Sequence, residues 1–342
     1  MNPINFGILG PGVVAEYFLQ AIRASADAGA RLAAVGHYRP ERFDEISAAF
    51  GAPCLATQDV IDHPDIDVIC ICTPSGQHAE QAVRAAEAGK HVLVEKPMAL
   101  TLDDADRMIK VCQKKGVTLG VVFQRRTEPV FQRVRRAVEA GDLGPLNLGV
   151  LTMPYVRAQA YYDSAPWRGT WSLDGGGVLM NQGIHLVDLL IWYMGDPVAI
   201  QATAATLRRD IEVEDTLTAT LRFADGALAS VSATTTAAPG FAHRLEIYGT
   251  KGAIQIEGEQ IYAWTLVDGH TPTIEPLEPG RAPDAGSGSD PRGISPSGHT
   301  AILRDFMQAV REGRPPLVDG TEGRRSLATI LAIYEAAGLH RA

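Results

Sequence analysis

The segment 175–192, GGGVLMNQGIHLVDLLIW, carries three polar side chains in an otherwise apolar run. Asn181, His185 and Asp188 follow one another at offsets of four and three, which fall on one face of a helix. Such a polar stripe either faces water or lines a cavity. Because an imidazole can accept or donate a proton near pH 7, the pattern indicates general acid–base chemistry at His185. A satisfied histidine in a structural core is the alternative.

A second reactive side chain follows the apolar run of HVLVEKP, residues 91–97. Lys96 is expected at the carboxyl end of a parallel strand, the edge at which open α/β sheets bind ligands. Its amine can meet a substrate hydroxyl, and the neighbouring Glu95 can orient it. A solvated lysine at the end of a strand is the simpler explanation.

A glycine-rich turn follows the first expected strand, in GILGPGVVA. Gly10 permits a tight turn, Gly12 lets a pyrophosphate approach the backbone, and Ala15 is small enough for close helix–strand packing. The start of the following helix offers N–H groups and a positive dipole to phosphates. We therefore predict a dinucleotide site whose turn consists of Gly10, Pro11, Gly12, Val13, Val14 and Ala15.

The end of the second expected strand bears on the choice of dinucleotide. NAD-specific proteins place an acid there to hold the ribose hydroxyls, whereas this chain has His37, Tyr38 and Arg39. A carboxylate would repel a 2′-phosphate, while His37 and Arg39 can accept one. The cofactor is therefore predicted to be NAD or NADP, with a slight preference for NADP. Arg39 stacked over the adenine or facing water is the alternative.

The elements that must hold these groups form repeated β-α-β units in the first third of the chain. Strands are expected over 4–9, 31–38, 67–74, 91–97 and 117–123, and helices over 13–26, 41–51, 78–89 and 102–116. The run DVICICTP is continuously apolar, as expected for a strand covered on both faces. The prediction is a Rossmann domain, a doubly wound parallel sheet, over residues 1–124.

The remaining residues, 125–342, predict an α+β domain built on a large open, mainly antiparallel sheet. Asp225-Gly226 and Lys251-Gly252 join strand-like runs and indicate hairpins. Strands are expected over 146–156, 216–223, 227–236, 244–249 and 252–258, and helices over 131–141, 299–313 and 323–338 besides the striped helix. Residues 151–180 are rich in loops, and 279–298 are dominated by Gly, Pro and Ser, which predicts a mobile loop.

Composition excludes several classes of partner. The 342 residues carry a net charge of −9 without a Lys/Arg run longer than two, which argues against nucleic acid and anionic membranes. The amino-terminal residues lack the pattern of a signal peptide, so a cytoplasmic location is expected. The four cysteines form no CxxC and are expected to be buried thiols. The nine histidines are scattered, and no metal site is indicated.

The glycine turn, EKP at 95–97 and the pattern GGG…N-x-x-x-H-x-x-D together resemble the Gfo/Idh/MocA family of oxidoreductases. The similarity runs over nearly the whole chain and includes the closing pattern GRPPLVDGTEGRRSLATILAIYEAA. The resemblance implies a dinucleotide-binding Rossmann domain, followed by a domain for substrate binding and oligomerisation. Members commonly form dimers and tetramers through that second sheet, so a homo-dimer or homo-tetramer is expected.

The resemblance also implies roles for individual residues. Lys96 matches the catalytic lysine and His185 the catalytic histidine. Members usually carry Asp four residues before that histidine; Asn181 here removes a charge but can still orient a ring nitrogen or a sugar hydroxyl. Asp188 either fixes the imidazole tautomer or is structural. Further positions matched near the cofactor are Thr73, Pro74, His78, Glu95, Lys96, Gln124, Trp167 and Arg168, and near the substrate Lys96, Arg126, Trp167, Asn181, His185 and Asp188.

The predicted activity is that of an NAD(P)-dependent oxidoreductase. It would transfer hydride between a nicotinamide and a secondary ring hydroxyl or ketone of a sugar, sugar derivative or cyclic polyol, with Lys96 and His185 handling the proton. The stretches AYYDSAPWRGTW and IEVEDT are most similar to members acting on sugars or nucleotide-linked sugars. A redox-neutral glycosidase or lyase that uses a tightly bound nucleotide through a transient keto-sugar is the alternative. A nucleotide-sensing regulator is a third, which would have no need of a proton acceptor.

Overall fold

A computed structural model describes residues 3–267, 269 and 296–339. The chain forms two compact units. The first comprises Met1–Thr127 with Ser295–Leu327, and the second comprises Glu128–Ile294 with Ala328–Ala342. Most of the predicted loop 279–298 lies outside the described residues, and only its last three residues, at the start of a helix, fall within them.

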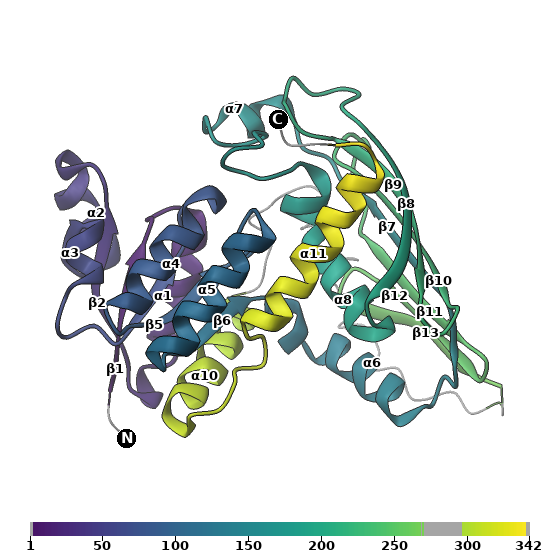
Figure 1. Ribbon diagram of the computed structural model, residues 1–342, viewed down its shortest axis with the longest axis horizontal. Coiled ribbons are helices and arrows are strands. Elements are labelled where there is room, and N and C mark those ends of the chain that lie inside the picture. The colour runs from purple at the N-terminus through teal and green to yellow at the C-terminus, as the bar shows by residue number, and fades with distance from the viewer. Residues whose placement is uncertain (1–2, 268, 270–295, 340–342) are drawn as a thin grey trace. The chain divides into compact units, whose positions relative to one another are not determined.

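A six-stranded parallel sheet forms the centre of the first unit, with the strand order β3-β2-β1-β4-β5-β6. Figure 1 labels four of its strands, β1, β2, β5 and β6. The strands are β1 (Ile4–Leu9), β2 (Ala30–His37), β3 (Cys54–Ala56), β4 (Val68–Ile71), β5 (His91–Glu95) and β6 (Leu119–Val122). Strand order reverses between β1 and β4, and ligands of doubly wound sheets bind outside the carboxyl ends at such a point. The predicted fold class is confirmed.

Helices of the first unit pack on this sheet and on one another. They are α1 (Val13–Ala24), α2 (Phe43–Phe50), α3 (Thr57–Ile61), α4 (His78–Glu87), α5 (Leu102–Lys115) and α10 (Pro296–Glu312), with short turns η1 (Ala26–Ala28), η2 (Pro40–Arg42), η3 (Ser75–Gln77) and η4 (Gln124–Thr127). In α5, the Thr101 hydroxyl accepts the Asp104 N–H at 3.1 Å and Gly116 ends the helix with φ of +68°. Local sequence therefore sets both ends of this helix.

Two features of the first unit differ from the sequence-based expectation. Strand β3 and helix α3 were not predicted, because each is only a few residues long. In addition, residues 295–327 belong to the first unit, although the expected boundary after residue 124 assigns them to the second domain. Residues 295–327 belong to the first unit because α10 packs on α1, and because the Val121 N–H donates to Val318 O at 3.0 Å.

The cysteines are all free, as predicted. Cys54, Cys70 and Cys112 are buried, and Cys72 is half-buried just after β4. Burial raises the pKa of the Cys70 thiol, and it raises that of Cys112 to about 11. The three buried thiols therefore behave as small apolar side chains.

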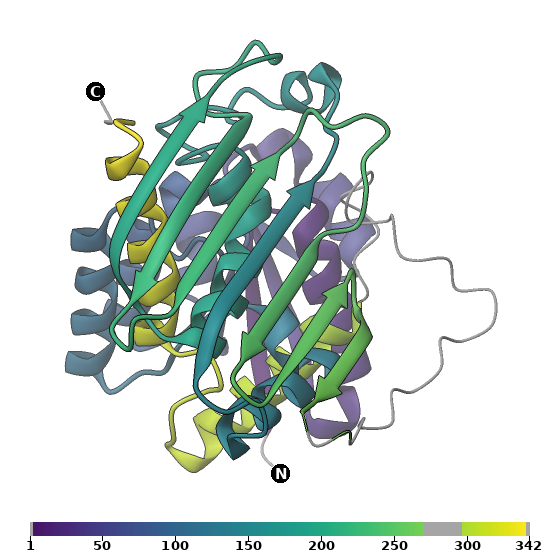
Figure 2. The ribbon, with the colours of Figure 1, turned by 90° about the vertical axis from the view of Figure 1, so that its right-hand side faces the viewer.

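A seven-stranded sheet dominates the second unit, with the order β13-β12-β11-β7-β10-β9-β8 (Figure 2). Its strands are β7 (Leu146–Pro154), β8 (Pro197–Ala205), β9 (Thr216–Phe223), β10 (Leu228–Thr234), β11 (Arg244–Gly249), β12 (Gly252–Glu257) and β13 (Gln260–Leu266). Among the described strands of this second sheet, only the pair β7–β10 is parallel, so the mainly antiparallel sheet is confirmed. Both predicted hairpins form, since β9 pairs with β10 and β11 with β12.

Buried and exposed side chains alternate along the strands of this sheet. In β9, Leu217, Ala219, Leu221 and Phe223 are buried while Thr218, Thr220 and Arg222 are exposed. The apolar face packs on the long helix of the 175–194 region: a Cβ at Gly149 in β7 would meet the Leu190 side chain at 2.9 Å. The small glycine therefore allows close approach of helix and sheet.

Helices of the second unit are α6 (Pro129–Ala140), α7 (Gln159–Asp163), the π-helical turn η5 (Val178–Gly183), α8 (Ile184–Met194) and the end of α11 (Gly320–Ala336), which belongs to this unit from Ala328 on. The predicted striped helix is divided: Asn181 lies in the π-helical turn, and only His185 and Asp188 lie in α8. No helix among the described residues is long and apolar enough to cross a membrane.

Candidate active site

The turn after β1 has the geometry predicted for a dinucleotide site. Gly10 adopts φ of +84°, and a Cβ there would meet the Thr73 backbone at 2.9 Å, so only glycine fits. Gly12 is the N-cap residue of α1, and a Cβ there would meet no heavy atom of the described chain within 4 Å. The backbone at Gly12 thus borders open space at a helix amino end. This arrangement fits the pyrophosphate of a dinucleotide.

The carboxyl ends of β4 and β5 are joined by a buried histidine. His78 at the start of α4 is 1% exposed, with Nε2 at 2.8 Å from Thr73 O and Nδ1 at 2.9 Å from Pro97 O. Burial lowers the pKa of this imidazole, although the two carbonyl contacts oppose the effect. His78 therefore holds the residues after β4, including Pro74, against those that follow Lys96. A cofactor contact at His78 remains a prediction.

Lys96 is half-buried immediately after β5. Its backbone N–H donates to Glu95 Oε2 at 3.2 Å, and the other carboxylate oxygen of Glu95 lies 3.4 Å from His299 Nε2. The His299 ring, on α10, stacks on Tyr17 of α1 with 5.1 Å between centroids. Glu95 is only 7% exposed, so a network of buried side chains fixes the start of the turn that presents Lys96.

The end of β2 presents the residues predicted to select the cofactor. His37 is 9% exposed, and its Nδ1 accepts the Arg39 N–H at 3.2 Å. Tyr38 is 73% exposed, and the Arg39 guanidinium lies 5.0 Å from the centre of its ring. The Arg39 side chain is therefore at the surface next to an exposed aromatic ring, where it can meet a ligand.

Gln124 and Arg126, in η4, are both buried. The Arg126 guanidinium is 2% exposed and pairs with Glu322 Oε2 at 2.7 Å. Burial opposes ionisation of Glu322, but the bonds from Arg126 and Arg325 prevail and lower its pKa. The ion pair ties η4 to the start of α11, which is a structural role; the predicted contacts of Gln124 and Arg126 with cofactor or substrate remain predictions.

In the second unit, the predicted residues surround the π-helical turn. Asn181 and His185 are half-buried, and Asp188 is 1% exposed. The Asn181 Nδ2 donates to Asp174 Oδ1 at 2.7 Å, while Asp174 Oδ2 accepts the Gly169 N–H at 2.9 Å. Asp174 therefore orients the Asn181 amide and ties it to the loop that follows Trp167 and Arg168. π-Helical turns are frequent at functional sites.

Arg168 contacts two aromatic side chains, Tyr161 of α7 and the neighbouring Trp167. Its guanidinium lies 4.3 Å from the centre of the Tyr161 ring and 4.5 Å from that of Trp167, and it donates to the Tyr161 hydroxyl at 2.6 Å. The side chains of Trp167 and Arg168, both predicted near the cofactor from the family resemblance, are thus in contact. Tyr161 was not predicted, although it stands in the quoted stretch 160–171.

Two further residues of this region were missed by sequence reasoning. The Glu214 carboxylate accepts the N–H groups of Gly177 at 2.8 Å and Leu179 at 3.0 Å, and the Tyr334 hydroxyl donates to it at 2.7 Å. Burial raises the pKa of Glu214 to about 7, although these hydrogen bonds oppose the rise. Glu214 stands in the quoted stretch IEVEDT and Tyr334 in the quoted closing pattern, but neither pattern indicates this contact.

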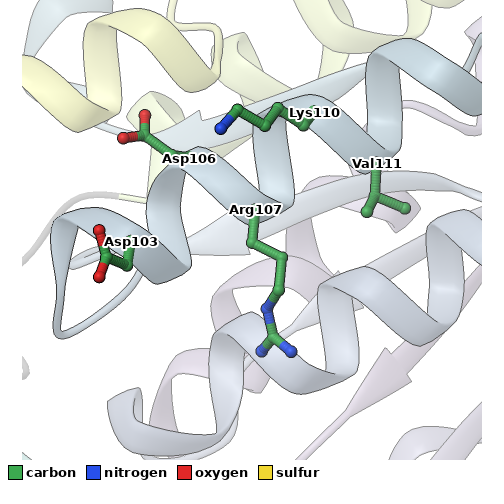
Figure 3. A pocket seen from close by; sticks show the side chains of 5 residues that line it. All are labelled: Asp103, Asp106, Arg107, Lys110 and Val111. Carbon is green, nitrogen blue, oxygen red and sulfur yellow. The ribbon is translucent and has the colours of Figure 1, made fainter.

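A surface hollow on the first unit is separate from all of these residues (Figure 3). It is lined by one helix, through Asp103, Asp106, Arg107, Lys110 and Val111 of α5. Asp106 pairs with Arg324 at 2.6 Å, and Arg107 contacts Glu80 and Asp104. The hollow holds no predicted site residue. Among the described residues, no three His, Cys, Asp or Glu side chains gather as a metal site would require.

A Rossmann unit with an open glycine turn and a lysine at a neighbouring strand end, followed by a unit with a large open sheet, defines a class of dinucleotide-dependent oxidoreductases. The profile described as "Oxidoreductase family, NAD-binding Rossmann fold" matches residues 4–123, and the one described as "GFO/IDH/MocA C-terminal domain" matches 131–255. The chain belongs to the Gfo/Idh/MocA family.

Individual relatives agree with this assignment. Inositol 2-dehydrogenase of Rhizobium meliloti strain 1021 is 31% identical over 279 residues, or 80% of this chain and 82% of its own. The WlbA dehydrogenase of Bordetella pertussis, solved with NADH and UDP-GlcNAcA, is 35% identical with a TM-score of 0.86, covering 98% of this chain and 97% of its own. Levoglucosan dehydrogenase, solved with NADH and levoglucosan, is 27% identical with a TM-score of 0.85, covering 98% of both chains.

These comparisons confirm the predicted family and enzyme class. The protein is a nicotinamide-dependent dehydrogenase or reductase of a family with members named for sugars and polyols. Within the first unit, the structure brings the glycine turn next to Thr73, and joins Thr73 through His78 to the residues after Lys96. Within the second, it groups Asn181 with Asp174 and Arg168 with Trp167.

Proposed function

We propose that the protein oxidises a secondary ring hydroxyl of a sugar, sugar derivative or cyclic polyol, or reduces the corresponding ketone. The observation that carries this proposal is the juxtaposition in the first unit. Gly12 borders open space after β1, the strand at which the strand order reverses, because a Cβ there would meet no described heavy atom within 4 Å. Lys96 follows β5, the strand that pairs with β4. We assign dinucleotide binding to the domain 1–124, and substrate binding and oligomerisation to 125–342.

The proposed chemistry separates a hydride from a proton. When bound, the nicotinamide supplies the hydride acceptor or donor. His185, as a neutral imidazole, accepts the hydroxyl proton, and the Lys96 ammonium donates a hydrogen bond that stabilises the developing alkoxide. Asn181, oriented by Asp174, is proposed to hold a sugar hydroxyl or the imidazole, and Asp188 to fix the imidazole tautomer from within the core.

The residues proposed to hold the cofactor include the turn 10–15, Thr73 and Pro74 after β4, and Glu95 and Lys96 after β5. Gln124, Trp167 and Arg168 are proposed to complete this set, and Trp167 and Arg126 to contribute to the substrate site. The choice between NAD and NADP depends on the end of β2. There His37 and Arg39 favour a 2′-phosphate, because no carboxylate occupies the position that holds the ribose hydroxyls in NAD-specific proteins.

We also propose self-association through the face of the seven-stranded sheet that is turned toward the viewer in Figure 2, and action in the cytoplasm. No described helix crosses that face in the view. It bears exposed apolar side chains: Leu148 of β7 and Leu228 of β10, which are 40% and 52% exposed, are cross-strand partners. Such a patch is typical of a protein–protein interface.

The test is a spectrophotometric screen at the absorbance band of reduced nicotinamide. Both cofactors are offered with a panel chosen from the names and ligands of the relatives: myo-inositol, scyllo-inositol, levoglucosan and UDP-GlcNAcA. Lys96→Ala and His185→Ala are each expected to lower kcat by about 10³-fold with the best substrate. Lys110→Ala, which removes an exposed lysine of α5, should leave kcat unchanged.

Two outcomes would redirect the proposal. Turnover that survives both Lys96→Ala and His185→Ala refutes the assigned roles. Protein that purifies with nucleotide bound, and converts a glycoside without net reduction of added cofactor, is instead the redox-neutral glycosidase or lyase.

A further inference from the structure

The amino end of the helix that carries His185 has no capping side chain of its own. Gly177 is the N-cap residue of the helical segment, and η5 (178–183) runs directly into α8. The first N–H groups of any helix lack intrahelical acceptors, and at a buried end they require partners from elsewhere. Here a residue distant in sequence supplies them: the Gly177 and Leu179 N–H groups donate to the two carboxylate oxygens of Glu214.

A second distant residue completes the cap. The Tyr334 hydroxyl, on α11, accepts the Met180 N–H at 3.1 Å and donates to Glu214 Oε1 at 2.7 Å. Glu214 is 1% exposed and Tyr334 is 2% exposed, so neither side chain can exchange these bonds for bonds to water. The Glu214 main chain adds a fourth contact, because its carbonyl accepts the Val178 N–H at 3.0 Å.

The two glycines that precede the helix leave room for this cap, because neither has a side chain. A Cβ at Gly177 would collide with the carbonyl oxygen of Glu214, and a Cβ at Gly176 would collide with the Tyr334 hydroxyl. Three segments conspicuous in the sequence therefore meet at one carboxyl group: GGG at 175–177, IEVEDT at 211–216 and the closing helix around 334. Residues of all three segments therefore lie together at the start of one helix.

We propose that Glu214 and Tyr334 are positioning residues that set the placement of His185 by fixing the first turn of its helix. The inference rests on the proposed role of His185 in proton transfer. His185 follows Met180 by five residues in continuous helical backbone, so a shift of the capped turn moves the imidazole with it. A misplacement of about 1 Å can cost about a hundredfold in rate.

The other end of the same helix provides a matched control. Tyr193, in the last turn of α8, is 3% exposed, and its hydroxyl donates to Phe131 O at 3.1 Å. Tyr334→Phe and Tyr193→Phe each delete one buried hydroxyl that hydrogen-bonds within the second unit. Only the first deletion affects the end next to His185.

The first experiment measures placement without turnover. In protein with ¹³C-labelled histidine, the His185 Cε1–H resonance is identified by its disappearance in His185→Ala. This resonance is expected to shift or broaden in Tyr334→Phe and in Glu214→Gln, and to stay unchanged in Tyr193→Phe. An unmoved resonance in a folded Tyr334→Phe protein overturns the inference, whatever the protein's activity proves to be.

The second experiment measures rate, with the best substrate of the screen. Tyr334→Phe and Glu214→Gln are expected to lower kcat by about tenfold to a hundredfold and to increase the deuterium isotope effect on kcat. Substrate KM and cofactor Kd should change by less than about threefold. A purely structural role predicts equal kcat losses in Tyr334→Phe and Tyr193→Phe, which would refute positioning. Should Glu214→Gln not fold, Tyr334→Phe still decides.

Discussion

The two units hold their candidate groups by different means. In the first, reactive positions lie at the ends of parallel strands, and their placement follows from strand order and a glycine turn. In the second, the candidate imidazole lies on a helix whose start is fixed by Glu214 and Tyr334, which are 37 and 154 residues from the N–H groups they accept. A strand-end site is specified locally, whereas a helix-end site depends on distant segments.

The largest effect is expected from an added methyl group at the helix-end site. Gly177→Ala should destabilise the second unit by about 4 kcal/mol or more, because the Cβ would overlap the Glu214 carbonyl oxygen. Denaturant unfolding measures the loss. A stable Gly177→Ala protein would show that the Glu214 cap moves to accommodate a methyl group. It would contradict the proposed difference between the helix-end and strand-end sites.

The next effect concerns pH and the buried carboxyl group of the cap. Burial raises the pKa of Glu214 from its ordinary 4.5 to about 7, so the folded protein binds this proton more tightly than the unfolded chain does. The contribution of this proton to the free energy of unfolding is fully present below pH 4.5 and is lost as the pH rises through about 7. The difference corresponds to about 3 kcal/mol, since each pH unit is worth about 1.4 kcal/mol.

Glu214→Gln removes this titration. The free energy of unfolding of the natural protein should therefore fall by about 3 kcal/mol relative to that of the variant between pH 4.5 and 8. Tyr334, the titratable side chain bonded to Glu214, does not interfere, because burial raises its pKa well above its ordinary value. Denaturant titrations at several pH values provide the measurement. A difference in free energy of unfolding between the two proteins that stays constant from pH 4.5 to 8 would contradict this expectation.

A smaller effect is expected from the equivalent substitution at the strand-end site. Gly12→Ala introduces the same methyl group at the start of α1, where φ is −91° and the Cβ meets no described atom. Stability without cofactor should change by less than about 1 kcal/mol. Dinucleotide affinity should fall about thirtyfold, or about 2 kcal/mol, because the methyl group fills the space proposed for the pyrophosphate. Calorimetric titration checks this. Unchanged affinity would refute the glycine-turn assignment.

The same contrast explains how much could be predicted from the sequence. The parallel sheet and the turn at Gly10 were predictable, because apolar periodicity and glycine punctuation are local signals. The hairpins at Asp225-Gly226 and Lys251-Gly252 were predictable for the same reason. Strand β3 was too short to leave such a signal.

What could not be predicted depends on contacts between distant segments. No local pattern tells Glu214 from a surface acid, or Tyr334 from a core aromatic, before the fold brings them to the same helix start. The π-helical turn at Asn181 escaped for a related reason, since α- and π-turns share one apolar pattern over six residues. Helix α10 belongs to the first unit because it packs on α1, and the local sequence of α10 does not indicate this contact.

The smallest effect tests the least constrained part of the strand-end site. Arg39 is exposed beside Tyr38, so its contribution to NADP binding is screened by water and should reach only about 1 kcal/mol. Arg39→Ala is expected to weaken NADP binding about fivefold and to leave NAD binding unchanged, as fluorescence titration of both cofactors would show. Arg42→Ala is the control, because Arg42 is already paired with Glu45 at 2.8 Å. Equal weakening of both cofactors would instead indicate that Arg39 stacks on the adenine, a contact that NAD and NADP share.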